Sequence, residues 1–401
     1  MKNLLIGILA ILAISCSDKW DVCEAQDQSN MTDLDKYLDK KMRRADLIGM
    51  QVAYINQEEI WQGNYGEKEW GTCNRVDENT LFMMASISKP VTAFGLLTLS
   101  DRGLLDLDDP INMHLPFEVV NPNHPDETIT IRMLLAHVSS IRDYWETLMP
   151  LYTIEAGGGD SPIELRDFLF DYLSPEGEYY NATENFYTHK PTEVNRYCNV
   201  GYALVGLIIE EISGQSFPEF MQDNVFDPLD MQDSYWRLAD IPHDNIATPH
   251  DMPYKKKTDF DEPRALPHFG YPDYPDGQLR ATAGDYGKFI RMMLNKGKVG
   301  NTQLVSEATI EEFVKVQYPE ASEHQALSWD YGEFDSFIYY LLMPNLPSHT
   351  GSDPGVATAV SFDLETGTAA VVLTNSPPYQ ILDEKVFYQE IMKRLLKEAT
   401  K

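Results

Sequence analysis

The segment Ser86-Ile87-Ser88-Lys89 places a hydroxyl and an amine three residues apart. On a helix, side chains at this spacing lie about 5–6 Å apart on one face. A serine alcohol is a poor nucleophile at neutral pH, and an amine that holds or accepts its proton activates it. The apolar stretches 82–85 and 90–99 predict that the segment leads into a buried helix. These residues indicate serine-based acyl transfer, although so short a pattern also occurs on solvated helices.

Two further polar groups lie far downstream, at Tyr197-Cys198-Asn199 and at His349-Thr350-Gly351. Considered singly, each has an ordinary structural explanation, because aromatic residues pack in cores and asparagine caps helices. The order of the three groups along the chain is what favours a single reactive site. We interpret Cys198 as a small buried side chain rather than a nucleophile.

Together, the SxxK, Tyr-x-Asn and His-Thr-Gly elements make the chain similar to the serine β-lactamase and penicillin-binding-protein superfamily, in particular to its class C β-lactamase and DD-peptidase-like branch. The stretch ITIRMLLAHVSSIRD at 129–143 resembles the "LLxHxSG" segment of that family. Further counterparts follow in order over roughly residues 35–395: the hairpin at 49–66, the turn at 103–110, and the segments 227–231, 277–286, 357–363 and 369–375.

The resemblance implies an α/β (α+β) fold, in which an antiparallel sheet built from both chain ends is flanked by helices and carries an inserted, mainly helical subdomain. Strand-like patterns at 49–66 and about 333–375, with helical patterns between them, agree with this arrangement. We expect one catalytic domain at 32–395, with a helical part at about 86–290 inserted into an α/β part at 32–85 and 291–395. One helix is expected over Tyr197–Glu211.

The resemblance also implies catalytic roles for the first two groups. Ser86 would attack a carbonyl carbon, with its own backbone N–H and that of Ser352 beside the developing oxyanion. Lys89 and Tyr197 would carry the proton, and the sequence leaves open which of them deprotonates Ser86. A phenol has a pKa near ~10, so Tyr197 can act near neutrality only if Lys89 stabilises the phenolate.

The remaining site residues are expected to bind substrate. Asn199 would hydrogen-bond Lys89 and the substrate's amide. The strand that contains His349, Thr350 and Gly351 would pair with the substrate backbone, and Gly351 would permit its close approach. His349 would supply polarity, or a positive charge if it is protonated.

Four positions depart from the family pattern. Class C β-lactamases carry lysine where this chain has His349, whereas DD-peptidases and many esterase or aminopeptidase relatives carry histidine, which argues against a dedicated β-lactamase. Ser140, Thr192 and Asp230 stand where the family usually has glycine. These three are turn positions, so they concern loop geometry rather than the catalytic set.

Composition sets outer limits on the function. A chain of 401 residues with 43% hydrophobic content can bury a large core, as one elaborate domain or two interleaved ones. A formal net charge of −31 argues against a nucleic-acid partner, which needs clustered Lys and Arg. The nine histidines show no metal-ligand spacing, so we predict neither a metal site nor a cofactor.

The N-terminus has the pattern of an export signal. An apolar run from Leu4 to Ile14 precedes Cys16 and is shorter than the ~20 residues that span a bilayer. Cys16 resembles a lipobox cysteine that is lipidated after cleavage, but Ala13 replaces the usual leucine, so simple cleavage remains an alternative. We predict a signal peptide at 1–15, a polar tether at 16–31, and a periplasmic or cell-envelope protein anchored to the membrane by a lipid on Cys16.

If Cys16 is lipidated, Cys23, Cys73 and Cys198 remain, an odd number without clustered spacing. The sequence therefore implies no framework of disulfide bridges.

These observations favour an exported serine hydrolase that forms an acyl-enzyme on Ser86. Its substrate would be a peptide or amide such as a D-Ala-D-Ala-type wall peptide, or a related β-lactam or ester, with peptidoglycan as a nearby partner. The sequence contains no GxSxG nucleophile elbow of an α/β-hydrolase. The alternative is a catalytically inactive relative that binds cell-wall fragments or peptides.

Overall fold

The computed structural model describes residues 28–253, 258–334, 345–378 and 384–401. The predicted signal peptide, Cys16 and most of the predicted tether lie outside these residues. Within the described ranges, no helix combines the length and apolar character needed to cross a bilayer.

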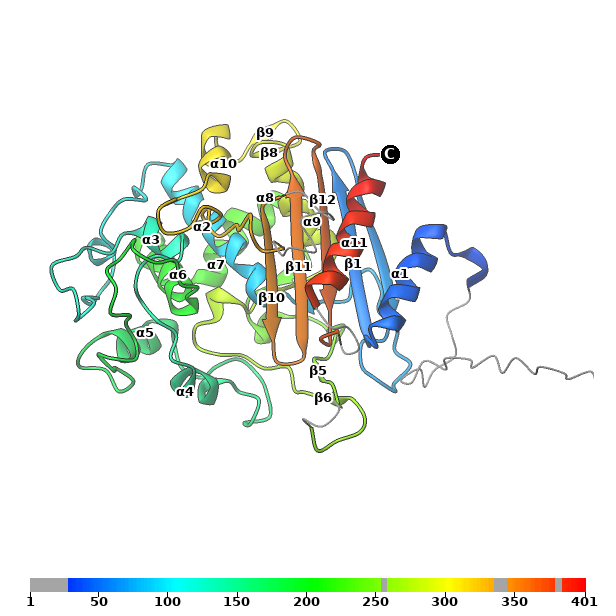
Figure 1. Cartoon of the computed structure of the whole chain (residues 1–401), viewed down its shortest axis with the longest axis horizontal. Coiled ribbons are helices and arrows are strands. Elements are labelled where there is room, and N and C mark those ends of the chain that lie inside the picture. Colours follow the sequence, from blue (N-terminus) through cyan, green and yellow to red (C-terminus); the bar gives the residue numbers. More distant parts are fainter. Residues whose placement is uncertain (1–27, 254–257, 335–344, 379–383) are drawn as a thin grey trace, which may run out of the picture.

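A five-stranded antiparallel sheet in the order β10-β11-β12-β1-β2 forms the centre of the α/β part (Figure 1). The strands β1 (Gly49–Asn56) and β2 (Ile60–Gly66) come from the N-terminal part of the chain. The other three, β10 (Ser348–Asp353), β11 (Val356–Asp363) and β12 (Thr368–Thr374), lie near the C-terminus. Distant parts of the chain meet where β1 pairs with β12, which confirms the predicted fold class.

Helices cover both faces of this sheet. Successive side chains of a strand point to opposite faces, so both sets must be apolar if both faces are covered. Val52 of β1 packs in the core beneath α1 (Asp33–Arg44) and α11 (Glu384–Ala399), which lie in front of the sheet in Figure 1. Its neighbour Ala53 belongs to the second core, on the side of α9 (Ala283–Leu294).

The helical part is built around α2 (Ser88–Asp101), whose residues 88–99 are all buried. A helix that is covered on all sides lies at the centre of its domain. It packs against α6 (Asn199–Ser213). The remaining elements are α3 (Ile131–Leu135), α4 (Trp145–Leu148), α5 (Leu165–Leu173), α7 (Phe217–Met221), α8 (Asp227–Leu229), α10 (Glu307–Val314), β3 (Phe82–Met83), β4 (Ser234–Tyr235), β5 (His250–Asp251), β6 (Arg264–Ala265), β7 (Arg280–Ala281), β8 (Lys298–Val299) and β9 (Thr302–Gln303).

The start of α6 differs from the helix predicted at Tyr197–Glu211. The helix begins two residues later, at Asn199, and Tyr197 precedes it. The Asp143 carboxylate accepts hydrogen bonds from the backbone N–H of Asn199 at 2.8 Å and of Val200 at 3.1 Å. The prediction of the boundary was wrong because this carboxylate, together with Cys198 as N-cap, satisfies the first N–H groups from Asn199 onward.

The turns at which glycine was expected keep a left-handed backbone without glycine. The φ angles are 63° at Ser140, 71° at Thr192 and 56° at Asp230. For a residue with a side chain this conformation costs roughly 1–2 kcal/mol. These three turns therefore carry local strain.

The cysteines differ partly from expectation. Cys198 is buried and free, as predicted, and burial raises the pKa of its thiol well above the ordinary value. Cys73 is disulfide-bonded, so the expectation of no bridges is wrong at that residue. Cysteine spacing does not reveal which residues the fold brings together.

Candidate active site

Ser86 lies on a tight 3-10 turn, η2 (Ala85–Ile87), that leads into α2. The preceding residue, Ala85, has a left-handed backbone with φ 48°. The hydroxyl of Tyr286 donates to the carbonyl of Ile87 at 2.8 Å, which holds this turn in place. Because the N-terminal end of a helix is electropositive, the backbone N–H of Ser86 is suited to a developing negative charge.

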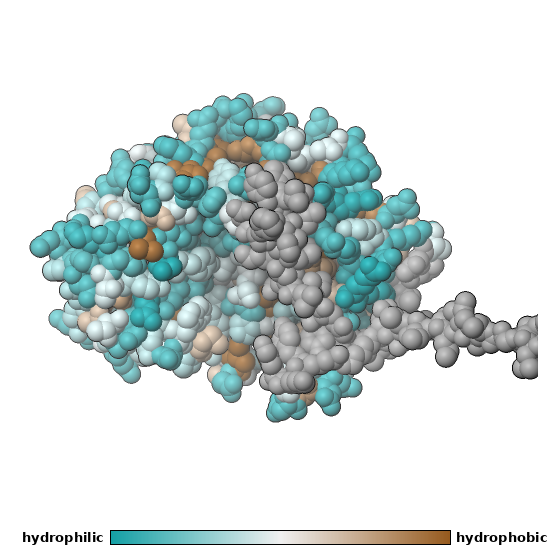
Figure 2. Space-filling view, in the orientation of Figure 1, coloured by the Kyte–Doolittle hydropathy of each residue, from teal (hydrophilic) through white to brown (hydrophobic). Residues whose placement is uncertain are grey.

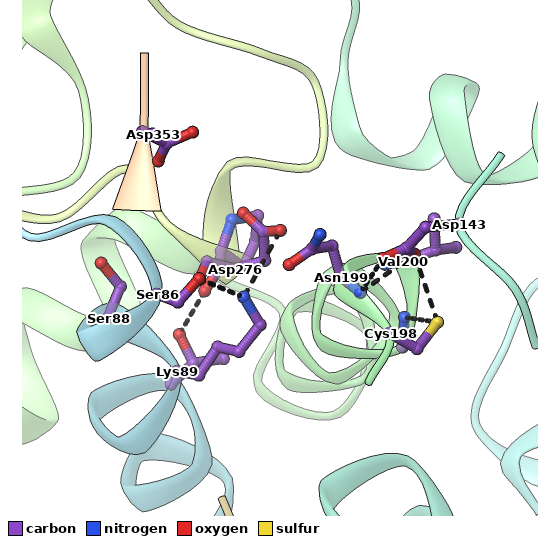
Figure 3. Close-up of polar contacts among 12 residues, drawn as sticks. Ser86, Ser88, Lys89, Asp143, Cys198, Asn199, Val200, Asp276 and Asp353 are labelled. Carbon is purple, nitrogen blue, oxygen red and sulfur yellow. Dashed lines mark hydrogen bonds and ion pairs between the residues drawn. The ribbon is translucent and has the colours of Figure 1, made fainter. Parts of the chain in front are cut away.

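Lys89 is fully buried, one helical turn after Ser86. Its Nζ donates to Ser86 Oγ at 3.3 Å and to the main-chain carbonyl of Asp276 at 2.9 Å, and it lies 3.6 Å from Asp276 Oδ2 (Figure 3). Burial lowers the pKa of Lys89, but the Asp276 carboxylate and Tyr197 outweigh burial and leave that pKa above its ordinary value. Lys89 is therefore an ammonium group at neutral pH.

Tyr197 lies at the mouth of the site, just before α6. The residue is 44% exposed, but its hydroxyl is buried beside Lys89 and Ser86. The ring centroid lies 4.8 Å from Lys89 Nζ. Burial raises the pKa of Tyr197 to about 12, even though Lys89 acts in the opposite direction. Lys89 therefore favours the phenolate, but loss of hydration has the larger effect, so Lys89 does not bring the pKa of Tyr197 to neutrality.

Sequence reasoning did not identify Asp276, which contacts Lys89 through both its backbone and its side chain. Burial raises the pKa of Asp276 to about 6, against the lowering effect of Lys89. A second carboxylate, Asp353, ends β10 and accepts hydrogen bonds from the hydroxyls of Tyr271 at 3.1 Å and Tyr152 at 3.4 Å. Asp276 could have been identified from its position in the sequence, because it immediately precedes the segment 277–286 that resembles the family.

The strand β10 forms the edge of the sheet beside Ser86. The backbone N–H of Ser348 donates to the carbonyl of Asp330, and the carbonyl of Ser348 accepts from the N–H of Asp330. Both hydrogen bonds lie on the side of β10 that faces away from β11. Alternate residues of a strand direct these groups to the same edge, so the N–H of Ser352 also faces this open edge. A Cβ on Gly351 would lie 2.9 Å from the backbone nitrogen of Ser86, so only glycine permits this close packing.

His349 is neutral at physiological pH. Burial lowers its pKa to about 4, and Lys89 contributes in the same direction. Its Nδ1 lies 2.6 Å from the carbonyl oxygen of Thr350, which can only accept, so Nδ1 carries the proton. Nε2 is then a hydrogen-bond acceptor. We expected His349 to supply either polarity or a positive charge. Because its imidazole is neutral, His349 supplies polarity.

Asn199 is nearly buried and faces the cavity beside Ser86. The expected hydrogen bond between Asn199 and Lys89 is absent, although the structure describes both residues. Lys89 instead donates to the carbonyl of Asp276. The part of this expectation that concerns Lys89 is therefore wrong, and the contact of Asn199 with a substrate amide stays a prediction.

The three sequence groups face a single cavity with a volume of about 310 Å³. Lys89 lies beneath Ser86, and Gly351 lies in the strand wall behind it. The cavity can hold a carbonyl group next to Ser86 Oγ with backbone N–H donors nearby. The lining residues are Ser86, His137, Trp145, Tyr197, Asn199, Gln325, Ser328, Asp330, Glu333, His349, Thr350 and Ser352.

Two proteins of known sequence are similar to this chain. Penicillin-binding protein 4* of Bacillus subtilis (strain 168) is 30% identical over 186 residues, which are 46% of this chain and 37% of that protein. Protein flp of Staphylococcus aureus (strain MW2) is 23% identical over 321 residues, or 77% of this chain and 60% of that protein. The chain thus spans less than two thirds of the length of either relative.

A solved structure shares the fold. The D-alanine carboxypeptidase AmpC from Burkholderia cenocepacia superposes with a TM-score of 0.64 at 18% identity, over 91% of this chain and 97% of that one. Residues 34–385 match the Beta-lactamase family. Because this match covers most of the sequence, the chain belongs to the Beta-lactamase family.

Proposed function

We propose that this protein is an exported serine hydrolase that forms an acyl-enzyme on Ser86. The observation that carries the proposal is the contact of Lys89 Nζ with Ser86 Oγ at 3.3 Å, with Tyr197 beside both groups at one cavity. Membership of the Beta-lactamase family supports the same chemistry.

The acylation step follows from these contacts. Ser86 Oγ attacks the substrate's carbonyl carbon as its proton passes to the Lys89–Tyr197 pair. The new C–O bond makes a tetrahedral oxyanion, which the N–H groups of Ser86 and Ser352 stabilise. Collapse of this intermediate breaks the bond to the leaving group, which takes the proton from Tyr197. Water then cleaves the ester and regenerates Ser86.

The substrate is a peptide or amide such as a D-Ala-D-Ala-type wall peptide, or a related β-lactam or ester. The similarity to a D-alanine carboxypeptidase and to a penicillin-binding protein supports this group of substrates. The neutral His349, in place of the lysine of class C β-lactamases, favours a peptidase or esterase over a dedicated β-lactamase.

Export to the periplasm or cell envelope is part of the proposal, with a lipid on Cys16 as the membrane anchor. The apolar run before Cys16 supports it. The disulfide at Cys73 also supports export, because disulfides persist mainly in oxidising compartments. This location would bring the enzyme close to peptidoglycan.

The test is intact-mass analysis of the purified protein after incubation with p-nitrophenyl acetate and, separately, with a penicillin. We expect an adduct of the mass of the acyl group in the wild type and none in Ser86→Ala. Ser100→Ala, on the same helix but away from the cavity, should keep the adduct. Circular dichroism checks that both variants are folded.

An adduct that survives in folded Ser86→Ala would place the nucleophile elsewhere. Absence of any adduct or turnover in the wild type would favour the inactive binding protein instead.

A further inference from the structure

Asp276 and Lys89 form a buried ion pair next to the reactive serine. Charged residues usually lie at the surface, and the face of the molecule in Figure 2 is accordingly dominated by hydrophilic residues. Lys89 and Asp276 are exceptions, because they are 0% and 4% exposed. Opposite charges interact more strongly where little water screens them. The charge of Asp276 therefore acts strongly on the proton of Lys89.

The geometry directs this charge at Lys89. Lys89 Nζ lies 3.6 Å from Asp276 Oδ2 and donates to the backbone carbonyl of the same residue at 2.9 Å (Figure 3). The other carboxylate oxygen, Oδ1, is buried and has no hydrogen-bond partner among the described residues. Within the described part of the chain, Lys89 is thus the one cation within 4.0 Å of this carboxylate.

The other titratable groups around Asp276 are acids. Asp276 ends the 3-10 turn η7 (Tyr274–Asp276). Carboxyl and phenol groups lie around it, from the segment before this turn, from β10, from both sides of α4 and from the residue before α6: Tyr271, Asp273, Asp353, Asp143, Tyr152 and Tyr197. None of these groups is a cation, so Lys89 supplies the positive charge that stabilises the Asp276 carboxylate.

Several other groups around Lys89 are neutral at physiological pH. Burial lowers the pKa of His349 to about 4 and that of His137 well below its ordinary value, so both imidazoles are uncharged. Burial raises the pKa of Tyr202, so this phenol keeps its proton. Among its neighbours, Asp276 has the largest effect on the charge of Lys89.

This contact bears on the proton that must leave the Lys89–Tyr197 pair before Ser86 attacks. The proton can leave from either group. The Asp276 carboxylate is paired with Lys89, whereas no hydrogen bond joins it to Tyr197 in the described chain. It therefore stabilises the ammonium form of Lys89 and favours loss of the proton from the phenol.

We propose that Asp276 is a positioning residue for the Ser86 reaction. Its carboxylate keeps the proton on Lys89, so that Tyr197 takes the proton of Ser86 and the site becomes active at a higher pH than it would without this carboxylate. Asp276 does not line the cavity, so it acts through Lys89. The inference rests on the proposed function and deepens it, because it assigns the proton transfer that the sequence leaves open.

The first test is the pH profile of kcat/KM for p-nitrophenyl acetate, corrected for uncatalysed hydrolysis, in the wild type and in Asp276→Asn. Asparagine keeps the shape of the side chain and the backbone carbonyl that accepts from Lys89, but it removes the charge. A neighbouring opposite charge shifts a pKa by about 1–3 units, so the rising limb should move about 1–3 pH units lower in the variant. A plateau should then appear below pH ~10 in the variant and not in the wild type.

Asp285→Asn is the matched control. Asp285 is a buried carboxylate that pairs with a lysine in the same way, at 2.9 Å from Lys288 Nζ, but it lies at the start of α9 and outside the cavity lining. Its loss should leave the pH profile as in the wild type. Circular dichroism checks that both variants are folded.

A double variant tests the assignment of the proton. Once Asp276 is asparagine, a neutral Lys89 can accept the proton of Ser86 in place of the phenolate. Tyr197→Phe should therefore lower kcat/KM by about tenfold less, or better, in the Asp276→Asn background than in the wild type.

A second measurement needs no variant of Asp276. In wild-type protein labelled with ¹³C at lysine Cε, the NMR signal of Lys89 is the one that disappears in Lys89→Arg. We expect it to keep the chemical shift of an ammonium group up to pH ~10.

A neutral Lys89 below pH ~9, or an unmoved limb in folded Asp276→Asn, would overturn the proposal. Failure of the proposed function is a different result, because hydrolysis would then persist in Ser86→Ala whatever the charge of Lys89.

Discussion

At the residue scale, burial acts in opposite ways on neighbouring groups of the site. It raises the pKa of Tyr197 to about 12, whereas Asp276 keeps Lys89 charged despite burial. The resting site therefore holds a phenol and an ammonium group, and neither is a ready base. One proton must leave this pair before Ser86 can attack, so the basic form of the site is scarce at pH 7.

This protonation state predicts a pH profile. A pKa raised above the ordinary value leaves less phenolate at any given pH, so kcat/KM for a neutral ester should rise about tenfold per pH unit from ~7 to ~10 without a plateau. Tyr197→Phe should lower kcat/KM by about 10²–10⁴ and flatten the profile. Stopped assays corrected for uncatalysed hydrolysis measure both effects.

Tyr235→Phe is the control. Tyr235 lies on the strand β4, and among the described contacts its hydroxyl donates only to the carbonyl of Gln232. It should reproduce the wild-type profile. A plateau beginning near pH 7 in the wild type would contradict the assignment of Tyr197 as the base with a high pKa.

At the element scale, several turns carry strain that the family usually avoids with glycine. Thr192 is the most unfavourable of these residues, because a β-branched side chain rarely adopts a φ of 71°. Its backbone N–H donates to the carbonyl of Val138 at 2.8 Å, and this bond connects the segment before α6 to the turn after α3. The strained turn thus helps to place Tyr197.

Thr192→Gly should relieve this strain. Left-handed backbone costs a residue with a side chain roughly 1–2 kcal/mol, and part of the gain is lost to the greater freedom of glycine in the unfolded chain. We expect a net gain of about 0.5–1 kcal/mol in the free energy of unfolding, measured by urea denaturation. Thr188→Gly, where φ is not positive, should instead lose about as much. Equal losses in the two variants would show that Thr192 is unstrained.

At the scale of the whole molecule, the sheet connects the two ends of the described chain. Because β1 lies between β2 and β12, the segments before the helical part and after it share two apolar cores. The catalytic groups come from both parts, with Ser86 in the turn before α2 and His349 on β10. The site can therefore form only when both parts are folded together.

The location of the molecule is a separate prediction at this scale. In a bacterial host, metabolic labelling with an alkyne fatty acid should label the wild type and recover it in the membrane fraction. Cys16→Ala should be unlabelled, because no other residue fits the lipobox position, and Cys198→Ala, which removes the free buried cysteine, should keep the label as the matched control. An unlabelled, soluble wild type would support simple cleavage of the signal peptide.

The sequence by itself was sufficient to predict the fold class and to predict that Ser86, Lys89 and Tyr197 lie in one site. The order of three short motifs and the apolar patterns of the strands are local properties that a sequence displays directly. The catalytic roles of these residues, and of Asn199, His349, Thr350, Gly351 and Ser352, stay predictions until the variants are measured. The domain limits at 32–395 likewise stay predictions.

Only the tertiary structure decided the charge states and the surroundings of these residues. Asp276 approaches Lys89 across 187 positions of sequence, and the Glu333 carboxylate reaches Thr350 from a separate loop. A pKa depends on which charges and how much water surround a group, and folding brings those neighbours together from distant segments. For this reason the high pKa of Tyr197 and the neutral His349 became visible only in the folded chain.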